Sequence, residues 1–156
     1  METLVSTFIY RHTRILIATE RPTEFIDLTD GLQRLVAEAG IVTGYANIHS
    51  LHTTAAIVVN EHEPLLLEDF ASVLERAAPD DGRYQHDNGT VRTVNLTPGE
   101  RRNGHAHCRA LLLGSSTCLN VVDGRLVLGR WQRIFLAEQD GPRAREISVL
   151  MIGGGR

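Results

Sequence analysis

The strongest constraint on the fold is a short uncharged run at residues 55–59, AAIVV, which is rich in β-branched side chains. A run of this length and composition predicts a strand that is buried on both faces, so the fold must supply a packing layer on each side. Polar residues stand at both ends of the run, as HTT at 52–54 and NE at 60–61. Because buried polar groups are costly unless they are paired, each end is expected to be a turn, a cap or part of a functional site.

The remaining segments alternate between strand-like and helix-like patterns. Two β-rich runs, 3–10 and 13–19, predict a hairpin that turns at Arg11 and His12. Apolar residues at helical spacing predict three helices, and other short runs predict further strands. The helices are expected at 27–40, 64–78 and 104–113, and the other strands at 44–50, 53–60, 117–122, 125–128, 131–138 and 146–152. This order predicts an α+β fold with mainly antiparallel sheets and about three helices, in a single domain spanning residues 1–156.

The longest predicted loop covers residues 79–104, which are polar and rich in Gly, Asp, Asn and Arg. Loops longer than about 12 to 15 residues in compact domains are usually functional or mobile. The motif YQHD, at residues 84–87, lies inside this loop. We therefore expect the loop to contribute side chains to a site.

The bulk composition narrows the function classes. Hydrophobic residues make up 42% of the 156 residues and charged residues 22%, and the formal net charge is −3. Without a basic excess, binding to nucleic acid or to an anionic membrane is not expected. The first residues lack a signal-peptide pattern, no run approaches the roughly 20 apolar residues of a membrane span, and the two cysteines have no metal-type spacing. A cytoplasmic protein is the resulting prediction.

All 16 basic residues are Arg, and the sequence contains no Lys. The absence of Lys excludes Schiff-base chemistry on a lysine and the lysine of a phosphate-binding P-loop. Arg matches phosphate and carboxylate groups with two parallel hydrogen bonds, so a small anionic substrate remains compatible with the composition.

Seven histidines raise the question of a metal site. His49 and His52 are three apart in a predicted strand region and point to opposite faces, and His105 and His107 point in nearly opposite directions on a predicted helix. One candidate then remains from each of three separate elements: His52, His86 and His107. Three neutral imidazoles with one open position suit Zn, Fe, Cu or Ni better than Mg, which prefers oxygen ligands.

Several motifs together resemble the YjbQ family, which is associated with a weak secondary thiamine-phosphate synthase activity. They are HTTAAIVVNE at 52–61, YQHD at 84–87, HAHCRALLLGSS at 105–116 and DGRLVLGRWQRIFLAEQDGPRAR at 123–145. The resemblance implies an α+β fold, a compact homotrimer and a cleft near the subunit contact. The family's histidines correspond to His52, His86 and His107.

The resemblance also implies roles for other residues. The reaction would condense hydroxymethylpyrimidine diphosphate with hydroxyethylthiazole phosphate and release diphosphate. Catalytic roles are expected for Glu61, His52 and Asp87, metal binding for His52, His86 and His107, and substrate binding for Trp131, Arg143, Ser116 and Arg109. Two positions depart from the family pattern: Arg130 replaces a small hydroxyl residue before WQ, and Arg109 replaces a common Lys.

Alternatives remain open for single residues and for the whole function. Trp131 either packs in the core or stacks on a pyrimidine, and Arg143 either pairs within its turn or holds a phosphate. The cofactor is expected to be Zn, Fe, Mn or Ni by ligand type, or Mg for the synthase reaction. The alternative functions are a metal-dependent hydrolase of a small phosphorylated or amide substrate, with Glu61 as base, and a non-catalytic trimer that binds a metabolite or metal.

Overall fold

A computed structural model describes residues 7–155 of the chain, so residues 3–6 of the first predicted strand lie outside the described residues. The described chain forms eight strands, three α-helices and one short 3-10 helix. In chain order they are β1 (Thr7–Ala18), β2 (Glu24–Asp27), α1 (Thr29–Ala39), β3 (Ile41–Ser50), β4 (Ala55–Glu61), α2 (Pro64–Ala77), η1 (Gln85–Asp87), α3 (Gly104–Leu113), β5 (Ser116–Val122), β6 (Arg125–Leu126), β7 (Gln132–Glu138) and β8 (Ala144–Gly155).

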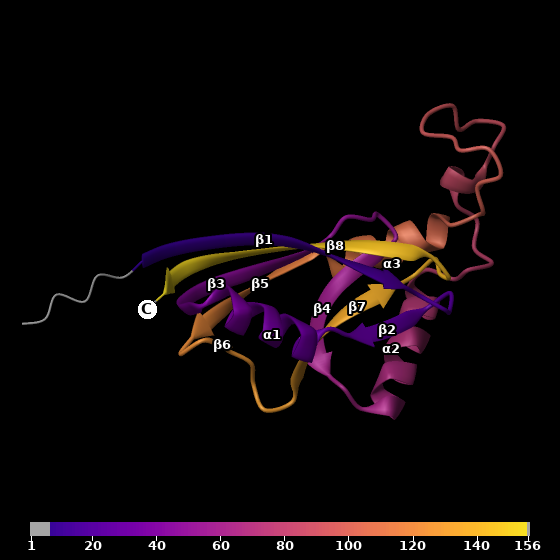
Figure 1. Ribbon diagram of the computed structural model, residues 1–156. Coiled ribbons are helices and arrows are strands. Elements are labelled where there is room, and N and C mark those ends of the chain that lie inside the picture. Colours follow the sequence, from indigo (N-terminus) through magenta and orange to yellow (C-terminus); the bar gives the residue numbers. More distant parts are fainter. Residues whose placement is uncertain (1–6, 156) are drawn as a thin grey trace, which may run out of the picture.

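The described strands form two antiparallel sheets (Figure 1). The larger sheet has the order β1-β8-β3-β5-β6, and the smaller sheet has the order β2-β7-β4. Every paired ladder of the described residues is antiparallel. The predicted α+β fold with mainly antiparallel sheets and three helices is therefore confirmed.

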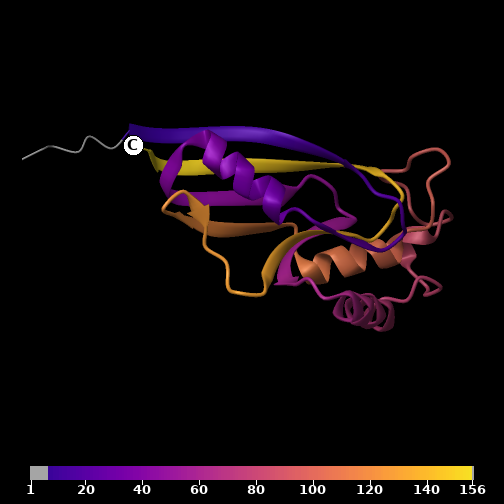
Figure 2. The same ribbon diagram turned by 60° about the horizontal axis from the view of Figure 1, so that its bottom comes forward.

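The main core lies between the two sheets and α1, which runs along one face of the larger sheet (Figure 2). Leu32 and Val36 of α1 pack into the same buried cluster as Ile48 of β3 and Leu136 of β7. The helix ends as predicted at Gly40, whose positive φ of 72° favours glycine. Within residues 7–155, no helix is long and apolar enough to cross a membrane.

Strand β4 is buried on both faces over its first half, as its composition predicts. Ala55 and Ile57 belong to the main core, and Ala56 between them is also fully buried. Helix α3 packs on β4 and contributes the buried small residues Ala106 and Ala110. The second half of the strand is less covered, since Val58 and Val59 are half-buried.

The predicted hairpin at the start of the chain is wrong. Residues 7–18 form one continuous strand, β1, and His12 pairs with Leu150 in the middle of its ladder with β8. Arg11 and His12 carry none of the conformational preferences of Gly, Pro, Asn or Asp that make a tight turn, so pairing with β8 decides the structure. The short strand β2 was not predicted, because four residues hold too little of a pattern.

The predicted long loop leaves the body of the protein after α2 and returns at α3 (Figure 1). It contains η1, followed by turns and extended segments with no regular element over residues 88–103. The loop thus forms a wall beside the ends of the two sheets.

Candidate functional site

A cleft of about 1030 Å³ opens between the long loop and the ends of the sheets. Its walls come from six segments: the β3–β4 turn, η1, the part of the loop that follows η1, the start of α3, the β7–β8 connection and the start of β8. His52, His86, His107 and Arg143 all line this cleft, whereas His49 and His105 do not. Helix geometry predicts that only one of His105 and His107 faces a given site, and His107 is the one that lines the cleft.

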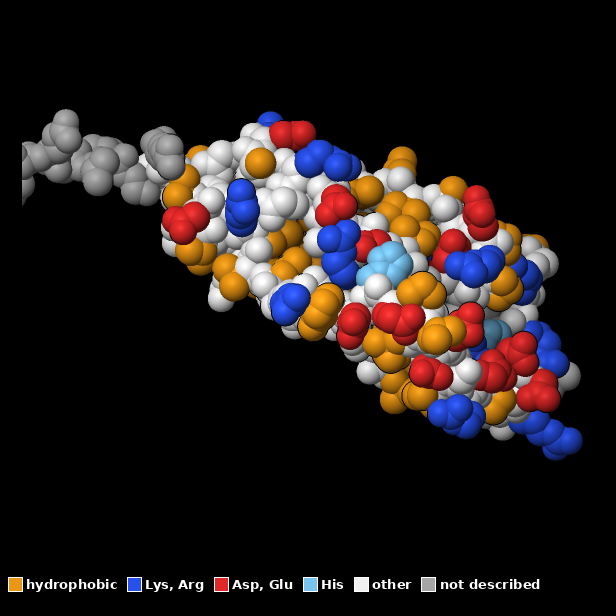
Figure 3. Space-filling view, turned by 90° about the horizontal axis from the view of Figure 1, so that it is seen from below, with side chains coloured by type: hydrophobic (Ala, Val, Ile, Leu, Met, Phe, Trp, Pro, Cys, Tyr) orange, Lys and Arg blue, Asp and Glu red, His pale blue; other side chains and the backbone are white. Residues whose placement is uncertain are grey.

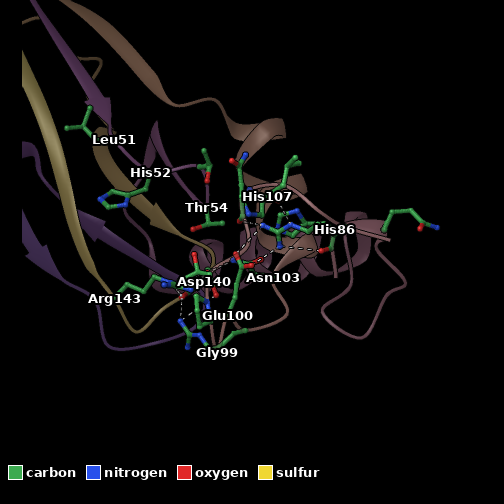
Figure 4. Close-up of a pocket in the computed structure, with 18 of the residues that line it drawn as sticks. Leu51, His52, Thr54, His86, Gly99, Glu100, Asn103, His107, Asp140 and Arg143 are labelled. Atoms are coloured by element: carbon green, nitrogen blue, oxygen red, sulfur yellow. Dashed lines mark hydrogen bonds and ion pairs between the residues drawn. The ribbon is translucent and has the colours of Figure 1, made fainter. Parts of the chain in front are cut away.

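His86 and His107 lie against each other inside the cleft (Figure 4). Their ring centroids are 4.5 Å apart, with the rings inclined at 60°. Burial and the neighbouring His86 lower the pKa of His107, so the neutral ring is favoured. The Nε2 atom of His86 is buried and has no hydrogen-bond partner within residues 7–155. An unpaired ring nitrogen at this place is available to a ligand or to proton transfer.

His52 lies apart from that pair, on the opposite side of the cleft (Figure 4). The backbone N–H of Glu146 donates a hydrogen bond of 2.8 Å to His52 Nε2, which places the ring proton on Nδ1. Burial and Arg145 lower the pKa of His52, consistent with a neutral ring. His52 is therefore arranged to donate from Nδ1.

The three histidines line one cleft without forming one ligand cluster. In the part of the chain that the structure describes, no group of three or more His, Cys, Asp or Glu side chains is placed to hold a metal ion. The Nε2 atom of His52 is already engaged. The single-chain geometry does not fit a three-histidine metal centre, and it leaves His86 and His107 as the two adjacent imidazoles.

A buried ion pair supports the floor of the cleft. Glu138 and Arg145 are 0% and 2% exposed, and Arg145 donates to both carboxylate oxygens of Glu138. Thr19 Oγ1 donates to Glu138 at 3.0 Å, and Arg145 donates to Thr54 Oγ1 at 3.0 Å. The ion pair thus joins β7, β8, the residue that follows β1 and the β3–β4 turn, so these parts of the cleft are held in a fixed geometry.

The loop wall is held by Arg92. Its guanidinium donates to Glu100 Oε2 at 2.8 Å and to the carbonyl oxygen of Asn95 at 2.7 Å, and it also donates to the carbonyl oxygen of His86. These hydrogen bonds hold residues 92–100 in a compact loop and connect that loop to the backbone of His86. This part of the loop is therefore a structured wall of the cleft.

Asp87, predicted to be catalytic, caps α3. Its Oδ1 accepts hydrogen bonds from the backbone N–H groups of Asn103 and Gly104, at 3.1 and 3.0 Å. The side chain of Asn103, the residue before the helix, makes no capping hydrogen bond, so Asp87 supplies the cap. Asp87 does not line the cleft, and its contacts give it the structural function of fixing α3, and with it His107, to η1.

Four other predicted site residues lie outside the cleft. Arg109 is buried and forms an ion pair with Glu75, with a further hydrogen bond of 2.9 Å to the carbonyl oxygen of Ala78. Trp131 is 61% exposed and lies beside the guanidinium of Arg130, 4.7 Å from its ring centroid. Ser116 is exposed, and Glu61 ends β4 opposite Gln132. A core position for Trp131 is ruled out, and the substrate and catalytic roles of these residues stay predictions.

Among the cleft residues that were not predicted are Arg101, Asn103 and Asp140. Arg101 and Asn103 immediately precede the helix that carries His107, and Asp140 stands three residues before Arg143 in the DGPR motif. Their proximity to selected residues was the available signal. The motifs themselves gave no reason to add these three residues to the predicted site.

Comparison with known proteins identifies the family. The residue pattern described as UPF0047 protein YjbQ-like matches residues 13–154. A UPF0047 protein of Methanothermobacter thermautotrophicus is 39% identical over 137 residues, 88% of each chain, and the UPF0047 protein YugU of Bacillus subtilis is 33% identical over 138 residues, 88% of this chain and 96% of that protein.

Solved structures agree with the sequence comparison. A YbjQ-like protein of unknown function from Sulfolobus solfataricus matches with a TM-score of 0.83 and 35% identity, over 94% of this chain and 99% of that chain. A hypothetical protein from Aeropyrum pernix matches with a TM-score of 0.81 and 34% identity, over 92% and 98%. The chain therefore belongs to the YjbQ-like, UPF0047 family of proteins.

Proposed function

We propose that the cleft is the active site of an enzyme that acts on a small anionic or phosphorylated substrate. The observation that carries this proposal is the meeting of His52, His86, His107 and Arg143, from four separate segments, on one cleft. Neutral imidazoles serve as proton donors and acceptors near neutral pH, and a guanidinium binds an anionic group. The volume of the cleft lies at the upper end of the range of about 300–1,000 Å³ typical of small-molecule sites.

The first candidate reaction is the condensation of hydroxymethylpyrimidine diphosphate with hydroxyethylthiazole phosphate, which the family resemblance implies. In this reaction Arg143 would bind the phosphate group of the thiazole substrate, and the His86–His107 pair would transfer a proton at the reacting end. A divalent cation such as Mg would neutralise charge on the departing diphosphate through oxygen ligands. Trp131 does not line the cleft, so another residue would have to serve as the pyrimidine platform within one chain.

The test is a turnover assay with the two substrates, in which thiamine phosphate and diphosphate are both measured. We expect turnover in the parent protein and a loss of about 10²–10⁴-fold in His107→Gln, the usual contribution of a general acid or base. His62→Gln is the matched control, because His62 pairs with Asp27 outside the cleft. Equal activity in the two variants would contradict the assignment of the cleft.

A second candidate is metal-assisted hydrolysis of a small phosphorylated or amide substrate. The observation that favours it is the unpaired, buried Nε2 of His86 beside His107. These two rings would bind Zn, Fe, Mn or Ni, with the remaining positions filled by water, substrate or a neighbouring copy. A bound ion of this type lowers the pKa of its water and supplies a nucleophile.

Elemental analysis separates the two candidates. About one equivalent of a transition metal per chain, lost in a His86→Gln/His107→Gln variant, together with hydrolysis of a single substrate, would support the hydrolase. Binding of a metabolite or metal without turnover of any substrate would support the non-catalytic alternative. Metal-free protein with synthase turnover would reject both the hydrolase and the non-catalytic alternative.

We also propose the homotrimer that the family resemblance implies. The outer face of the larger sheet carries a row formed by Tyr10, Ile152 and Tyr45 across β1, β8 and β3, with Phe8 exposed on the same face of β1. Exposed apolar surface of this kind is typical of an interface. Light scattering should give the mass of three chains, and Tyr10→Arg should lower it. A single-chain mass for the parent protein would reject the trimer.

The surface charge favours a small molecule over a polyanion as the partner. On the face seen in Figure 3, acidic and basic side chains are interspersed and form no continuous basic stripe. A nucleic-acid-binding surface needs such a stripe to neutralise successive phosphates. A cytoplasmic location, the sequence-based prediction, remains part of this proposal.

A further inference from the structure

Two of the four arginines that line the cleft within residues 7–155 are largely buried and held by contacts within the protein. Arg145 is buried in its ion pair with Glu138. Arg92 uses Nε, Nη1 and Nη2 for Glu100 and for carbonyl oxygens of the loop. Because the side chains of Arg145 and Arg92 are only 3% and 13% exposed, little of either is open to a ligand.

The other two arginines, Arg101 and Arg143, converge on one carboxylate. Arg143 Nη2 and Nε lie 2.7 and 2.9 Å from Asp140 Oδ2. Arg101 Nη2 lies 3.5 Å from Asp140 Oδ1 and donates to the carbonyl oxygen of Asp140 at 2.7 Å. Two positive charges thus share one negative charge, so the group keeps a formal charge of about +1.

The excess charge is presented to the cleft. The carboxylate side chain of Asp140 is 7% exposed, whereas the side chains of Arg101 and Arg143 are 48% and 37% exposed. A guanidinium has five N–H donors. Within the described residues, Arg101 Nε and Arg143 Nη1 donate no hydrogen bond. Each arginine therefore retains at least one unused donor.

Asn103 adds a buried acceptor at the same place. Its Nδ2 donates to Asp140 Oδ2 at 2.9 Å, and this bond fixes the orientation of the amide because a carboxylate can only accept. The other amide atom, Oδ1, is buried and has no partner within residues 7–155, and the residue is 5% exposed. An acceptor left unpaired in a cleft wall calls for a ligand that carries an O–H or N–H group.

We propose that Arg101, Arg143 and Asn103 form a subsite for the singly protonated phosphate group of a phosphate monoester. The two arginines donate to the phosphate oxygens, and Asn103 Oδ1 accepts from the P–OH group. The formal charge of the subsite matches a monoanion. This inference rests on the proposed function, because it identifies the anionic group of the substrate of the same cleft.

The position of the subsite orients the rest of the substrate. Figure 4 shows Asp140 and Asn103 between Arg143 and the His86–His107 pair. A phosphate held by the two arginines therefore directs the organic part of the substrate toward the two imidazoles. Arg101 and Asn103 act here as binding residues, and proton transfer is left to the histidines.

The test is calorimetric titration of the full chain with inorganic phosphate and with sulfate at roughly pH 6, where phosphate carries a P–OH group and sulfate does not. We expect saturable phosphate binding, weakened at least about tenfold in Arg101→Gln and in Arg143→Lys, the size expected for the loss of a charge-assisted hydrogen bond. Arg102→Gln is the matched control, because Arg102 is an exposed neighbour that does not line the cleft. Sulfate should bind several-fold more weakly than phosphate.

Equal weakening in Arg101→Gln and Arg102→Gln would overturn the subsite, and sulfate binding as tight as phosphate binding would overturn the assignment of a protonated phosphate to Asn103. Failure of the subsite is distinguishable from failure of the enzyme proposal. Turnover that depends on His107 but has an unchanged KM in Arg101→Gln rejects the subsite alone. Phosphate binding that depends on Arg101, in a protein without turnover, supports the subsite and rejects the enzyme.

Discussion

Polar residues stand at both ends of strand β4, but the two ends have different structural roles. The residues before the strand, 52–54, meet the buried Glu138–Arg145 ion pair and line the cleft. The last two residues of the strand, Asn60 and Glu61, are exposed and half-buried and lead into α2, whose first N–H groups are capped by Glu63. One polar end is therefore part of a site, and the other leads into a helix cap.

The length of the strand separates these two environments. Seven residues of β4 at about 3.3 Å per residue span roughly 20 Å, so His52 and Glu61 of one chain cannot share a cleft of this size. His52 and Glu61, both expected from the sequence to be catalytic, therefore do not line the same cleft within a single chain. A strand that delivers residues to a site does so at one end, and the partner residues come from other segments.

The largest expected effect is at the cleft end. Glu138→Gln should lower the free energy of unfolding by about 3–5 kcal/mol, because it leaves Arg145 charged and buried without its partner. Urea denaturation followed by circular dichroism measures the loss. Glu61→Gln, at the other end of the strand, is the matched control and should change stability by less than about 0.5 kcal/mol. Similar losses in the two variants would remove the contrast between the ends.

The opposite end should show its own effect in acid. Burial alone would raise the pKa of Asp27. The hydrogen bonds that its carboxylate accepts from Thr29 N, Arg133 and His62 outweigh burial and lower the pKa to about 2. A carboxyl with a lowered pKa stabilises the folded state above its unfolded pKa of 3.8 and loses that contribution as pH falls toward 2.

We expect this contribution to be about 2 kcal/mol, and it should be missing in Asp27→Asn. Denaturation of both proteins between neutral pH and roughly pH 2 measures the difference between their stability curves. Curves that remain parallel over this range would show that the Asp27 network does not stabilise the fold.

A smaller effect is expected from the cap of α2. Glu63 accepts from Leu65 N at 3.0 Å and from Leu66 N at 2.8 Å, and Glu63→Ala should cost about 1 kcal/mol. Phosphate binding in the cleft should not change. A weakened affinity for phosphate in this variant would show that the two ends of β4 are coupled.

The smallest effect is expected for Glu61→Gln in the turnover assay. Because Glu61 does not line the cleft, kcat/KM should stay within about twofold of the parent value. A hundredfold loss would instead support the catalytic role predicted from the sequence, and it would place Glu61 in the cleft of a neighbouring copy. Light scattering on the variant would then check that the assembly is unchanged.

Much of the fold was predictable because it depends on local patterns. The period of Leu28, Leu32 and Val36, ended by Gly40, identifies α1, and the uncharged run of β4 identifies a doubly buried strand. The first hairpin was mispredicted because only the distant partner β8 decides that β1 continues through His12. Long-range pairing of this kind leaves no local pattern.

The site was predictable in part from sequence motifs. Helix geometry indicates that only one of His105 and His107 can face a site, the family motif selects His107, and the structure places His107 beside His86. The sequence does not reveal that Asp140 joins Arg101 to Arg143, since these two residues are 42 positions apart and meet only through the loop. Nor does it reveal that Asp87 of YQHD is used as a helix cap.

The most direct test of the cleft as the active site is a crystal structure of the protein soaked with hydroxyethylthiazole phosphate. We predict that the phosphate group lies on Arg101 and Arg143, with the thiazole ring directed toward His86 and His107. A ligand bound instead at the Glu61 end of β4 or on Trp131, with no density between the two arginines, would contradict the assignment.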